Sequence, residues 1–447
     1  MADKKVDVII IGAGPGGLAA AYGLASNKTV LVVENDLWGG TCPNRGCDPK
    51  KMLYSVVHTK QQAADLAAVG LKSDSSINWE EMMEFKKQYT EKIPSGTLDG
   101  LKSANILTEH GKATFIDETT ISVNDTSYQA DKFVLATGLH PAIPQIEGNE
   151  FIHTSADFLS MPHLPEKVAF IGGGFVGIEL ANIAAESGAE VHLIQHNDQV
   201  LKRYPKELTS ALVDSMKDHG VHFHFDTTLS SIRERADGDY ELLGENDFSI
   251  EVDEVFAAMG RVPKLDSLNL NVAGVNYDNH GIQVNAFLET SNPNIYAVGD
   301  VVNRSQPKLT PVASFEGAYV AEGILTNNDH DSIRYPAIPQ VVYSSLQIAT
   351  TGVSLSEAVD NPSLYTVKTV KTGSWYTFNR IQDPNAVVIT VLDKKNSTIA
   401  GATVLSKIAD EIINYFTFEI NQKADKQAVA HQIPAYPTPA SDMTYYL

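Results

Sequence analysis

The chain contains very little cysteine: Cys42 and Cys47 are the only two among 447 residues. A protein of this length buries a large core and does not need a covalent cross-link to fold. A disulfide that closes so short a loop would add only about 2 kcal/mol by the loop-entropy model. The pair is therefore better explained by redox chemistry than by reinforcement, the alternative being two unrelated buried thiols.

Long hydrophobic runs and excess positive charge are also missing. No apolar stretch approaches the roughly 18 residues of a membrane span. With 34 Lys and Arg against 55 Asp and Glu, the net charge of -21 argues against nucleic acid or an anionic membrane as a partner. The apolar N-terminal stretch contains Asp7 and leads into glycines, so it does not predict an export signal. We expect a cytoplasmic chain, where a disulfide is usually catalytic or sensing.

A glycine-rich motif follows the first predicted strand. Residues 6–11 are apolar and β-branched, which predicts a buried parallel strand, and a helix over 18–26 and a strand over 29–33 follow. In the dinucleotide-binding fingerprint, three glycines allow the turn, the approach of a pyrophosphate and helix packing, and an acid binds a ribose hydroxyl. The alternative is a tight turn without a ligand. The motif residues are Gly12, Gly14, Gly17 and Glu34.

The same unit occurs a second time. A strand over 167–171, a helix ending at 187 and a strand over 190–194 surround a second glycine motif. Two fingerprints about 160 residues apart predict two nucleotide sites, one for FAD and one for a nicotinamide cofactor. The alternative is a degenerate second motif, although its glycines are intact. These glycines are Gly172, Gly174 and Gly177.

Two further strand ends suggest how the domains are arranged. Thr137 and Gly138 follow one strand before the second fingerprint, and Gly299 and Asp300 follow another after it. This order predicts an FAD-binding domain over 1–145 and 270–334, interrupted by an NAD(P)-binding domain over 146–269. The proline-rich segment 335–339 marks a boundary. A strand over 386–392 and a helix over 408–420 predict a C-terminal α+β domain over 335–447, so the fold class is α/β with two Rossmann-like domains.

The spacing of the cysteines constrains their local structure. On an ideal helix, residues five apart are separated by roughly 7.5 Å of rise and about 140° of rotation. That exceeds the roughly 7 Å between Cα atoms that a disulfide tolerates. The surrounding glycines and Pro43 must therefore hold a distorted turn at a helix start, where the helix dipole favours a thiolate.

These motifs resemble the flavoprotein disulfide reductases, the family of glutathione reductase, dihydrolipoamide dehydrogenase and mercuric reductase. The resemblance covers nearly the whole chain, and its most specific element is GGTCPNRGCDPKK at residues 39–51. It implies a homodimer whose C-terminal domain forms the interface and completes the partner's active site. It also implies cofactor contacts from Gly40, Thr41, Lys50, Thr137, Gly138, Gly260, Arg261, Gly299 and Asp300.

The resemblance assigns separate roles to the two thiols. Cys42 would be the interchange thiol that attacks the substrate, and Cys47 would lie against the flavin as the charge-transfer thiolate. Lys50 would sit near flavin N5, paired with Glu179. Independently of the family, a lysine one helical turn from a redox thiol favours the thiolate. Without the family, two unrelated charges would explain the lysine and the glutamate equally well.

The residues after the second fingerprint favour NADPH over NADH. An NADH enzyme typically ends the second strand with an acid, and here that position is Gln195. Without a carboxylate the 2′-phosphate meets no repulsion, and His196, Lys202 and Arg203 could pair with it. Against this, Gly177 is common in NADH-type loops, and the cations could form an ordinary solvated surface.

The C-terminus departs from the family pattern. Disulfide-reducing relatives end in a His-Pro-Thr segment whose histidine handles the substrate proton, and Tyr436 stands in its place here. A phenol is a poor base at neutral pH, and loss of a positioned acid–base removes roughly 10²–10⁴ in rate. Asp442 or His431 are alternative replacements. Asp48, next to the flavin-side cysteine, would disfavour an anionic substrate.

The sequence thus predicts an NAD(P)H-dependent, FAD-containing oxidoreductase with a redox-active Cys42–Cys47 disulfide. Its substrate would be a low-molecular-weight disulfide, with Tyr436 as the acid, or another small oxidant. Hypothiocyanous acid, a quinone or a metal ion needs less help with a proton. A mercuric reductase is disfavoured because no C-terminal cysteine pair is present to receive the metal. A slowly cycling redox-sensing flavoprotein is the alternative from another class.

Overall fold

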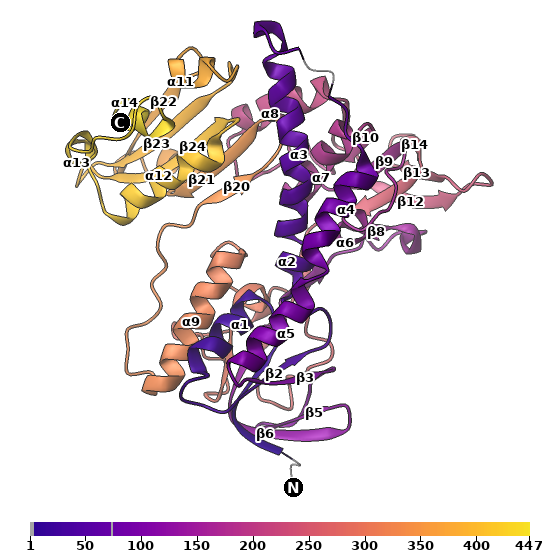
Figure 1. Cartoon of the computed structure of the whole chain (residues 1–447), viewed down its shortest axis with the longest axis vertical. Helices are drawn as coiled ribbons and strands as arrows, with labels where there is room; N and C mark the ends of the chain where they lie inside the picture. Colours follow the sequence, from indigo (N-terminus) through magenta and orange to yellow (C-terminus); the bar gives the residue numbers. More distant parts are fainter. Residues whose placement is uncertain (1–3, 73–74) are drawn as a thin grey trace. The chain divides into compact units, whose positions relative to one another are not determined.

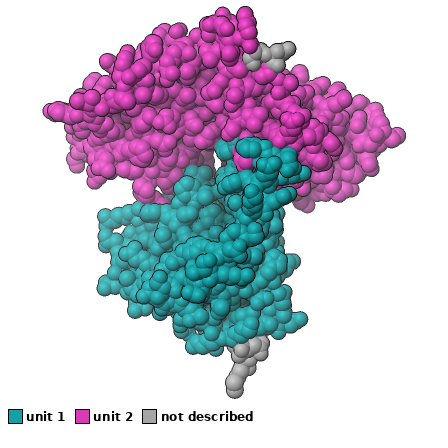
Figure 2. All heavy atoms as spheres, viewed as in Figure 1, with its two compact units in different colours: residues 1–51, 84–142, 261–334 teal, residues 52–83, 143–260, 335–447 magenta. Residues whose placement is uncertain are grey.

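The computed structural model describes residues 4–72 and 75–447. The chain forms two compact units, each assembled from segments that are distant in the sequence (Figure 2). The first unit comprises Met1–Lys51, Glu84–Ala142 and Arg261–Arg334. The second comprises Met52–Met83, Ile143–Gly260 and Tyr335–Leu447.

The first unit is built on one largely parallel sheet (Figure 1). Its strands are β1 (Lys4–Ile11), β2 (Val30–Glu34), β3 (Leu107–His110), β4 (Thr114–Asp117), β5 (Thr120–Val123), β6 (Thr126–Leu135) and β19 (Ile295–Ala297). They lie in the order β3-β2-β1-β6-β5-β4, with β19 paired to β6. β1 pairs in parallel with β2 and β6, whereas β4 and β5 are antiparallel. The last residues of β1 are buried on both faces, as expected for a central parallel strand.

Two helices of the first unit, α1 (Pro15–Leu24) and α9 (Thr310–Thr326), lie side by side (Figure 1). Their close approach requires small residues: a Cβ on Gly317 would lie 2.1 Å from the carbonyl oxygen of Gly16. α1 begins at Pro15 and not at the predicted residue 18, because proline favours the first helical position. The helix therefore begins directly after the glycine loop, whose last residue is Gly14.

The second unit contains a sheet of the same parallel type. Its strands are β8 (His153–Thr154), β9 (Lys167–Ile171), β10 (Glu190–Ile194), β11 (Val221–His224) and β15 (Glu254–Ala257), in the order β11-β10-β9-β15-β8. The helix α7 (Phe175–Glu186), between β9 and β10, is almost entirely buried, whereas α8 (Lys206–Asp218) buries one face. A small antiparallel sheet of β12 (Leu229–Glu234), β13 (Tyr240–Gly244) and β14 (Ser249–Val252) adjoins it in sequence. The connection β9–α7–β10 repeats β1–α1–β2.

The C-terminal segment forms an antiparallel sheet with helices. Its strands are β20 (Gln340–Val342), β21 (Gln347–Gly352), β22 (Tyr365–Lys371), β23 (Val387–Asp393) and β24 (Ile399–Ser406), in the order β20-β21-β24-β23-β22. The helix α12 (Ala409–Asn421) packs on β21 and β24. Short helices complete the segment: α10 (Leu355–Asp360), α11 (Tyr376–Asn379), α13 (Lys426–Ala430) and α14 (Met443–Tyr446). Two parallel Rossmann-like sheets and this C-terminal domain confirm the predicted α/β fold class.

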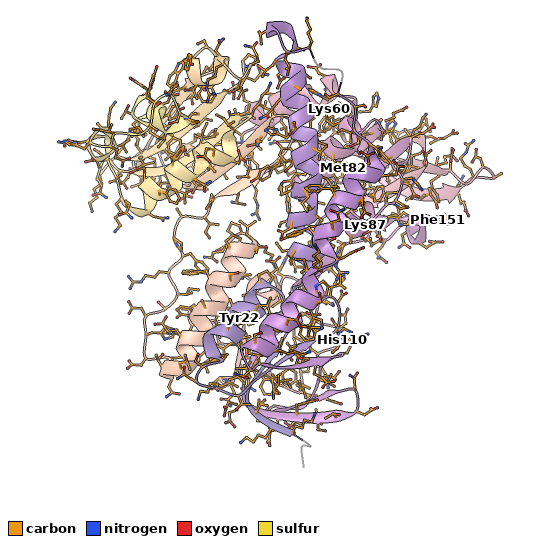
Figure 3. All side chains as sticks on the ribbon, in the orientation of Figure 1. Tyr22, Lys60, Met82, Lys87, His110 and Phe151 are labelled. Carbon is orange, nitrogen blue, oxygen red and sulfur yellow. The ribbon has the colours of Figure 1, made fainter. Side chains whose placement is uncertain are left out.

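Two long helices run across the division between the units. α3 (Cys47–Asp65) is divided after Lys51, and α4 (Trp79–Thr90) is divided after Met83. In the second unit, α3 and α4 contribute Leu53 and Met82 to the same hydrophobic core, and Figure 3 labels Met82. The helices α5 (Ile93–Ser103) and α6 (Ser155–Phe158) belong to one unit each. None of the described helices is long and apolar enough to cross a membrane.

Three histidines lie close together on neighbouring strands of the second unit. His192 Nδ1 lies 2.9 Å from His224 Nε2, and the rings of His192 and His222 stack. Burial, and then the charges of His192 and His222, lower the pKa of His224 to about 4. Because the folded pKa lies below the ordinary value near 6.5, folding favours the neutral imidazole. This contribution to the free energy of unfolding is complete when the pH is above the ordinary histidine pKa near 6.5, and it is lost as the pH falls toward 4.

We therefore expect the unfolding temperature to fall more between pH 6.5 and pH 4 in the wild type than in His224→Asn. Carboxylates titrate in the same range, so only the difference between the two proteins reports on the imidazole. The measurement is calorimetry at several pH values, with His163→Asn, an exposed histidine elsewhere in this unit, as the control. Parallel pH profiles for the wild type and His224→Asn would contradict this account.

Candidate active site

The two cysteines lie on successive helices of the first unit and not on one continuous helix. Cys42 belongs to α2 (Thr41–Arg45), and Cys47 is the first residue of α3. Gly46 separates the helices, and a Cβ there would lie 2.9 Å from the carbonyl oxygen of Thr41. The break lets the Cys42 thiol donate a hydrogen bond to the sulfur of Cys47.

The electrostatics of this pair distinguish the two thiols, which are both free in this structure. The hydrogen bond from Cys42, and then the charges of Lys50 and Lys51, lower the pKa of Cys47 to about 6 against the opposing effect of burial. The same hydrogen bond, together with burial, raises the pKa of Cys42 far above its ordinary value. At neutral pH the pair therefore holds a thiolate at Cys47 and a thiol at Cys42.

Further groups stabilise negative charge at the cysteines. The hydroxyl of Thr310, the first residue of α9, can donate a hydrogen bond to either sulfur and lowers both pKa values. Lys50 is buried one turn into α3, so its charge acts on Cys47 across little water.

Glu179 is also buried, on α7 of the second unit, and accepts a hydrogen bond from the backbone N–H of Tyr343 at 3.1 Å. The pairing of Lys50 with Glu179 joins residues of different units and stays a prediction.

The first glycine loop has the geometry of a nucleotide cradle. A Cβ on Gly12 would lie 2.3 Å from the carbonyl oxygen of Ala136, and one on Gly17 would lie 1.9 Å from that of Gly12. A Cβ on Gly14 would find its nearest atom 3.9 Å away, so the protein's own packing does not require that glycine. The space beside Gly14 fits the close approach of a pyrophosphate.

The acid at the end of β2 is oriented by the same loop. One carboxylate oxygen of Glu34 accepts a hydrogen bond from the N–H of Ala13 at 2.8 Å, and the other accepts from the N–H of Asp36 at 2.9 Å. Both contacts fix the side chain beside the glycines. Remaining acceptor sites on its oxygens fit the ribose hydroxyl that the sequence predicts.

The strand ends of β6 and β19 carry the other predicted flavin residues. The hydroxyl of Thr137 is buried without a hydrogen-bond partner among the described residues, and Gly138 has a positive φ of 68° with open space where a Cβ would be. Burial raises the pKa of Asp300, against the opposing charges of Arg261, Arg304 and Lys308. An unsatisfied hydroxyl and an open glycine at neighbouring strand ends fit a polar cofactor such as FAD.

A buried ion pair that the sequence did not predict holds Gly299. Glu316 on α9 is fully buried and accepts hydrogen bonds from the N–H of Gly299 and from Arg304 Nη1, both at 2.7 Å. The same Nη1 donates to the carbonyl oxygen of Gly299 at 2.7 Å. Arg304 Nε and Nη2 are buried without partners in the described part of the chain. No motif spacing signals this pair, because its members meet only when α9 packs beside β19.

The second glycine loop repeats the first with one chemical change. A Cβ on Gly172 would lie 2.6 Å from the carbonyl oxygen of Ala258, and one on Gly177 would lie 2.2 Å from that of Gly172. At Gly174 the nearest atom is 3.8 Å away, which again leaves space for a pyrophosphate. Gln195 Oε1 accepts from the N–H of Gly173 at 2.8 Å, the contact that Glu34 makes in the first loop. A neutral carboxamide therefore occupies the position of the acid.

Several other predicted cofactor residues lie at the surface or in open backbone. His196, Lys202 and Arg203 are exposed, with His196 Nε2 3.1 Å from Asn197 Nδ2. Gly260 has a positive φ of 109° and no neighbour near its missing Cβ. In the first unit, Arg261 donates from Nη2 to the carbonyl oxygen of Leu139 at 2.6 Å, between β16 (Arg261–Pro263) and β7 (Leu139–Pro141).

The C-terminal candidates for proton transfer belong to the second unit. Tyr436 is 81% exposed, and His431 Nδ1 lies 2.7 Å from the carbonyl oxygen of Gln427 on its own helix. Asp442 has one buried oxygen without a partner among the described residues. The cysteines belong to the first unit, so a role for these side chains beside Cys42 stays a prediction.

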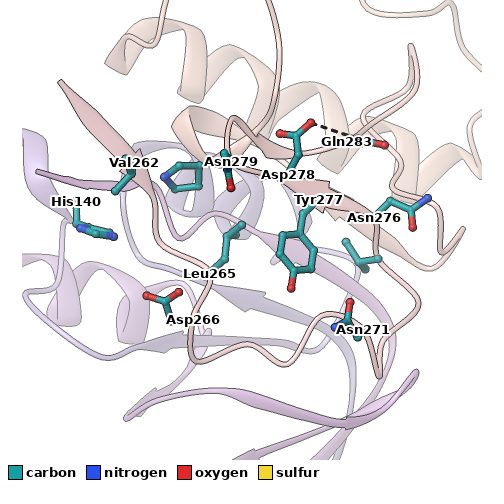
Figure 4. A pocket seen from close by; sticks show the side chains of 12 residues that line it. His140, Val262, Leu265, Asp266, Asn271, Asn276, Tyr277, Asp278, Asn279 and Gln283 are labelled. Atoms are coloured by element: carbon teal, nitrogen blue, oxygen red, sulfur yellow. Dashed lines mark hydrogen bonds between the residues drawn. The ribbon is translucent and has the colours of Figure 1, made fainter. Parts of the chain in front are cut away.

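A cavity of about 890 Å³ lies in the first unit (Figure 4). Its wall includes residues of β16, of β17 (Tyr277–Asp278) and of the segments that flank β18 (Gly281–Ile282). Figure 4 shows Asp278 with its hydrogen bond from Gln283 and Tyr277 on the same wall. The lining residues do not include Cys42 or Cys47, so we do not assign the substrate to this cavity.

Two nucleotide cradles and a polarised dithiol define an oxidoreductase that joins dinucleotide binding to thiol chemistry. Residues 6–317 match the family model described as pyridine nucleotide-disulphide oxidoreductase, and residues 338–445 match its dimerisation domain. The chain belongs to this family, and the family implies a flavin and a pyridine nucleotide. The predicted resemblance is therefore confirmed.

Curated relatives and a solved structure agree with this assignment. Glutathione reductase of Nostoc sp. is 30% identical over 98% of this chain and 98% of the relative. Dihydrolipoyl dehydrogenase of Geobacillus stearothermophilus is 30% identical over 97% of this chain and 94% of the relative. The HOCl-induced flavoprotein disulfide reductase RclA of Escherichia coli, solved as a Cu(II) complex of a cysteine-to-serine mutant, shares the fold. Its TM-score is 0.89 at 22% identity, and 99% of both chains is covered.

Proposed function

We propose that this protein is an NADPH-dependent, FAD-containing reductase that uses the Cys42–Cys47 pair to reduce a small oxidant, either a low-molecular-weight disulfide or a non-disulfide acceptor. The polarity of the dithiol is the observation that carries this proposal. A thiolate at Cys47 and a thiol at Cys42 are the states that a relay needs after reduction. Two unrelated thiols would have no reason to share a hydrogen bond and a cluster of cations.

Bound FAD would supply the transfer of an electron pair from the nicotinamide to the disulfide. In the reduced protein, Lys50, Lys51 and Thr310 hold Cys47 as the thiolate. Cys42 attacks the oxidant, and Cys47 then displaces the reduced product from the Cys42 sulfur. The disulfide re-forms, and two electrons have passed to the oxidant.

Two classes of oxidant are each supported by a different observation. Glutathione reductase and dihydrolipoyl dehydrogenase among the relatives favour a disulfide. Tyr436 in place of the family histidine favours an oxidant whose leaving group needs little proton help, such as hypothiocyanous acid, a quinone or a metal ion. The description of RclA as HOCl-induced points to the same class of small oxidants.

A panel of acceptors tests the proposal. Reduced protein, prepared with NADPH, is mixed with glutathione disulfide, cystine, hypothiocyanous acid, a quinone and Cu(II), and NADPH oxidation is followed. We expect turnover with at least one uncharged oxidant. Turnover of glutathione disulfide at rates near those of glutathione reductases would refute the non-disulfide acceptors, and no turnover with any acceptor would refute the reductase.

A redox-sensing flavoprotein is the second candidate, and a rapid-mixing experiment separates it from an enzyme. With NADPH, a reductase forms a long-wavelength thiolate-to-flavin absorption band quickly and completely. A sensor would react slowly or leave the cysteines oxidised.

The matched dimerisation domain supports a homodimer, and size-exclusion chromatography with light scattering tests that state.

Exchanging one carboxamide for a carboxylate is expected to change the nicotinamide preference. Gln195→Glu keeps the hydrogen bond from Gly173, because Glu34 makes the same contact in the first loop. The new charge repels a 2′-phosphate and accepts from a 2′-hydroxyl, so the ratio of kcat/KM for NADPH over NADH should fall about tenfold or more. Steady-state kinetics with both cofactors measure it.

Gln145→Glu supplies the matched control for this change. Gln145 is exposed in the same unit, so the substitution adds the same charge away from the loop. The control should leave the cofactor ratio unchanged. If Gln195→Glu leaves the ratio unchanged as well, the preference is not determined at this strand end.

A further inference from the structure

A carboxylate and a phenol of the first unit extend the cysteine pair on the side of Cys42. Asp48 Oδ1 accepts a hydrogen bond from Cys42 Sγ at 3.8 Å. Asp48 Oδ2 accepts a hydrogen bond from the hydroxyl of Tyr89 at 3.0 Å. The three side chains come from α2, α3 and α4, and Asp48 is half-buried. They form a continuous chain from the substrate-side sulfur to a phenol.

The proton of Cys42 has two acceptors within reach, the sulfur of Cys47 and the carboxylate of Asp48. Cys47 must stay a thiolate, because it has to displace the product from Cys42 in the following step. If Cys47 took the proton, it would no longer be the nucleophile that this step needs. Asp48 can accept the proton and leave Cys47 as the thiolate.

The charged groups around this chain of hydrogen bonds act differently on the two sulfurs. The charges of Lys50 and Lys51 act on Cys47, and the hydroxyl of Thr310 can donate a hydrogen bond to either sulfur. The negative charge of Asp48 contributes to the raised pKa of Cys42, so Asp48 favours the protonated thiol at Cys42 in the resting dithiol. The hydrogen bond to Asp48 raises the pKa of Tyr89, which therefore stays a donor at neutral pH.

We propose that Asp48, positioned by Tyr89, is the catalytic acid–base for Cys42 in this chain. The inference rests on the proposed function and supplies the proton transfer that the absent C-terminal histidine would otherwise perform. Asp48 touches the reacting sulfur and is a catalytic residue. Tyr89 acts through Asp48 and is a positioning residue.

The step balances for an oxidant written X–Y. The Cys42 sulfur forms a bond to X while its proton passes to Asp48, the X–Y bond breaks, and Y leaves with the electron pair and takes the proton as HY. The Cys47 thiolate then attacks the Cys42 sulfur, forms the disulfide and releases X as an anion. The two thiol sulfurs are oxidised by two electrons in total, and X–Y is reduced by two.

A carboxylate is a weak base toward a resting thiol, yet it is adequate here. As the bond from sulfur to X forms, the sulfur becomes electron-poor and its proton becomes strongly acidic. A base positioned beside that proton is needed mainly in the transition state, where it contributes about 10²–10⁴ in rate. The distance of 3.8 Å is long for a hydrogen bond to sulfur, and catalytic hydrogen bonds are often long before substrate tightens them.

The first test separates the half-reactions in Asp48→Asn, which keeps the shape and removes the base. We expect the reoxidation of reduced protein by an uncharged disulfide, 2-hydroxyethyl disulfide, to slow about a hundredfold. Reduction by NADPH should change less than about threefold, because Cys47 keeps its hydrogen bond from Cys42 and its cations. Asp99→Asn is the control, since Asp99 is an exposed carboxylate of the same unit.

The second test needs no turnover. The reduced protein is alkylated with iodoacetamide at pH 6 to 9, and mass spectrometry follows Cys42 and Cys47 separately. Because the pKa of Cys42 is raised, its thiolate fraction grows about tenfold per pH unit in this range. In Asp48→Asn, the rate of Cys42 alkylation should rise with pH as steeply as the thiolate fraction and should be lower than in the wild type near neutral pH. In the wild type, this rate should depend less on pH. Alkylation of Cys47 should not change.

The two tests have outcomes that overturn the inference. If Asp48 only repels a thiolate, Asp48→Asn lowers the pKa of Cys42 and speeds both alkylation and reoxidation. Unchanged reoxidation would equally exclude Asp48. Asp48→Glu should restore part of the rate, and an equal loss in Asp48→Glu and Asp48→Asn with slower NADPH reduction would indicate a structural role.

Tyr89→Phe tests the positioning role. Losing one hydrogen bond to a charged group should slow reoxidation about three- to tenfold and leave NADPH reduction unchanged. Tyr22→Phe is the control, because Tyr22 on α1 is similarly exposed, 46% against 44% for Tyr89. A wild-type protein that no oxidant reoxidises refutes the proposed function itself, whereas a normal wild type with an unaffected Asp48→Asn refutes only this inference.

Discussion

Replacing Cys42 by serine is expected to lower turnover with the oxidant at least about a thousandfold, because the nucleophile is removed. Cys47→Ser should be equally inactive for a different reason. Its Cys42 still attacks the oxidant, but no thiolate is present to displace the product. The measurement is NADPH oxidation with the best acceptor, followed by intact-mass analysis of each variant after one equivalent of oxidant.

The mass analysis gives the two variants opposite signatures. Cys47→Ser should carry one equivalent of the oxidant fragment on Cys42, and Cys42→Ser should carry none. The hydrogen bond from Cys42 is the largest cause that lowers the pKa of Cys47, so in Cys42→Ala the thiolate should form only at higher pH. Turnover in Cys42→Ser above a tenth of the wild-type rate would show that the acceptor takes electrons without the dithiol.

Gly17→Ala is expected to destabilise the first unit by about 3 kcal/mol or more, through overpacking against backbone. The new Cβ would lie 1.9 Å from the carbonyl oxygen of Gly12, and backbone cannot move aside as a side chain can. The loss should appear in the protein without cofactor as well as in the loaded protein. Denaturant unfolding of both forms measures it.

Gly14→Ala is the matched comparison in the same loop. Its Cβ finds nothing closer than 3.9 Å, so the unfolding free energy of the cofactor-free protein should change by less than about 0.5 kcal/mol. FAD retention should nevertheless be lost, because the methyl group occupies the space that a pyrophosphate approaches. Retention of FAD in Gly14→Ala would contradict the assignment of this loop to the flavin.

Much of the fold could be predicted because its signals are local. The alternation of apolar strand, glycine turn and helix occurs twice, and β9 and β10 have the bounds that the sequence predicts, Lys167–Ile171 and Glu190–Ile194. The start of α1 was less accurate, since helical periodicity is weak across glycines. The pair Arg304 and Glu316 had no local signal, because one residue lies in a loop and the other on a helix.

The sequence by itself determined the family and the two glycine loops, and it predicted that the two cysteines form a redox pair. These follow from residue types at fixed short spacings, which the backbone near each motif converts directly into geometry. Only the tertiary structure decided how the pair is polarised. The break at Gly46, the cations of α3 and the start of α9 put the thiolate at Cys47 and the thiol at Cys42. Tyr89 reaches Asp48 only because α4 packs beside α3, and no spacing in the sequence encodes that contact.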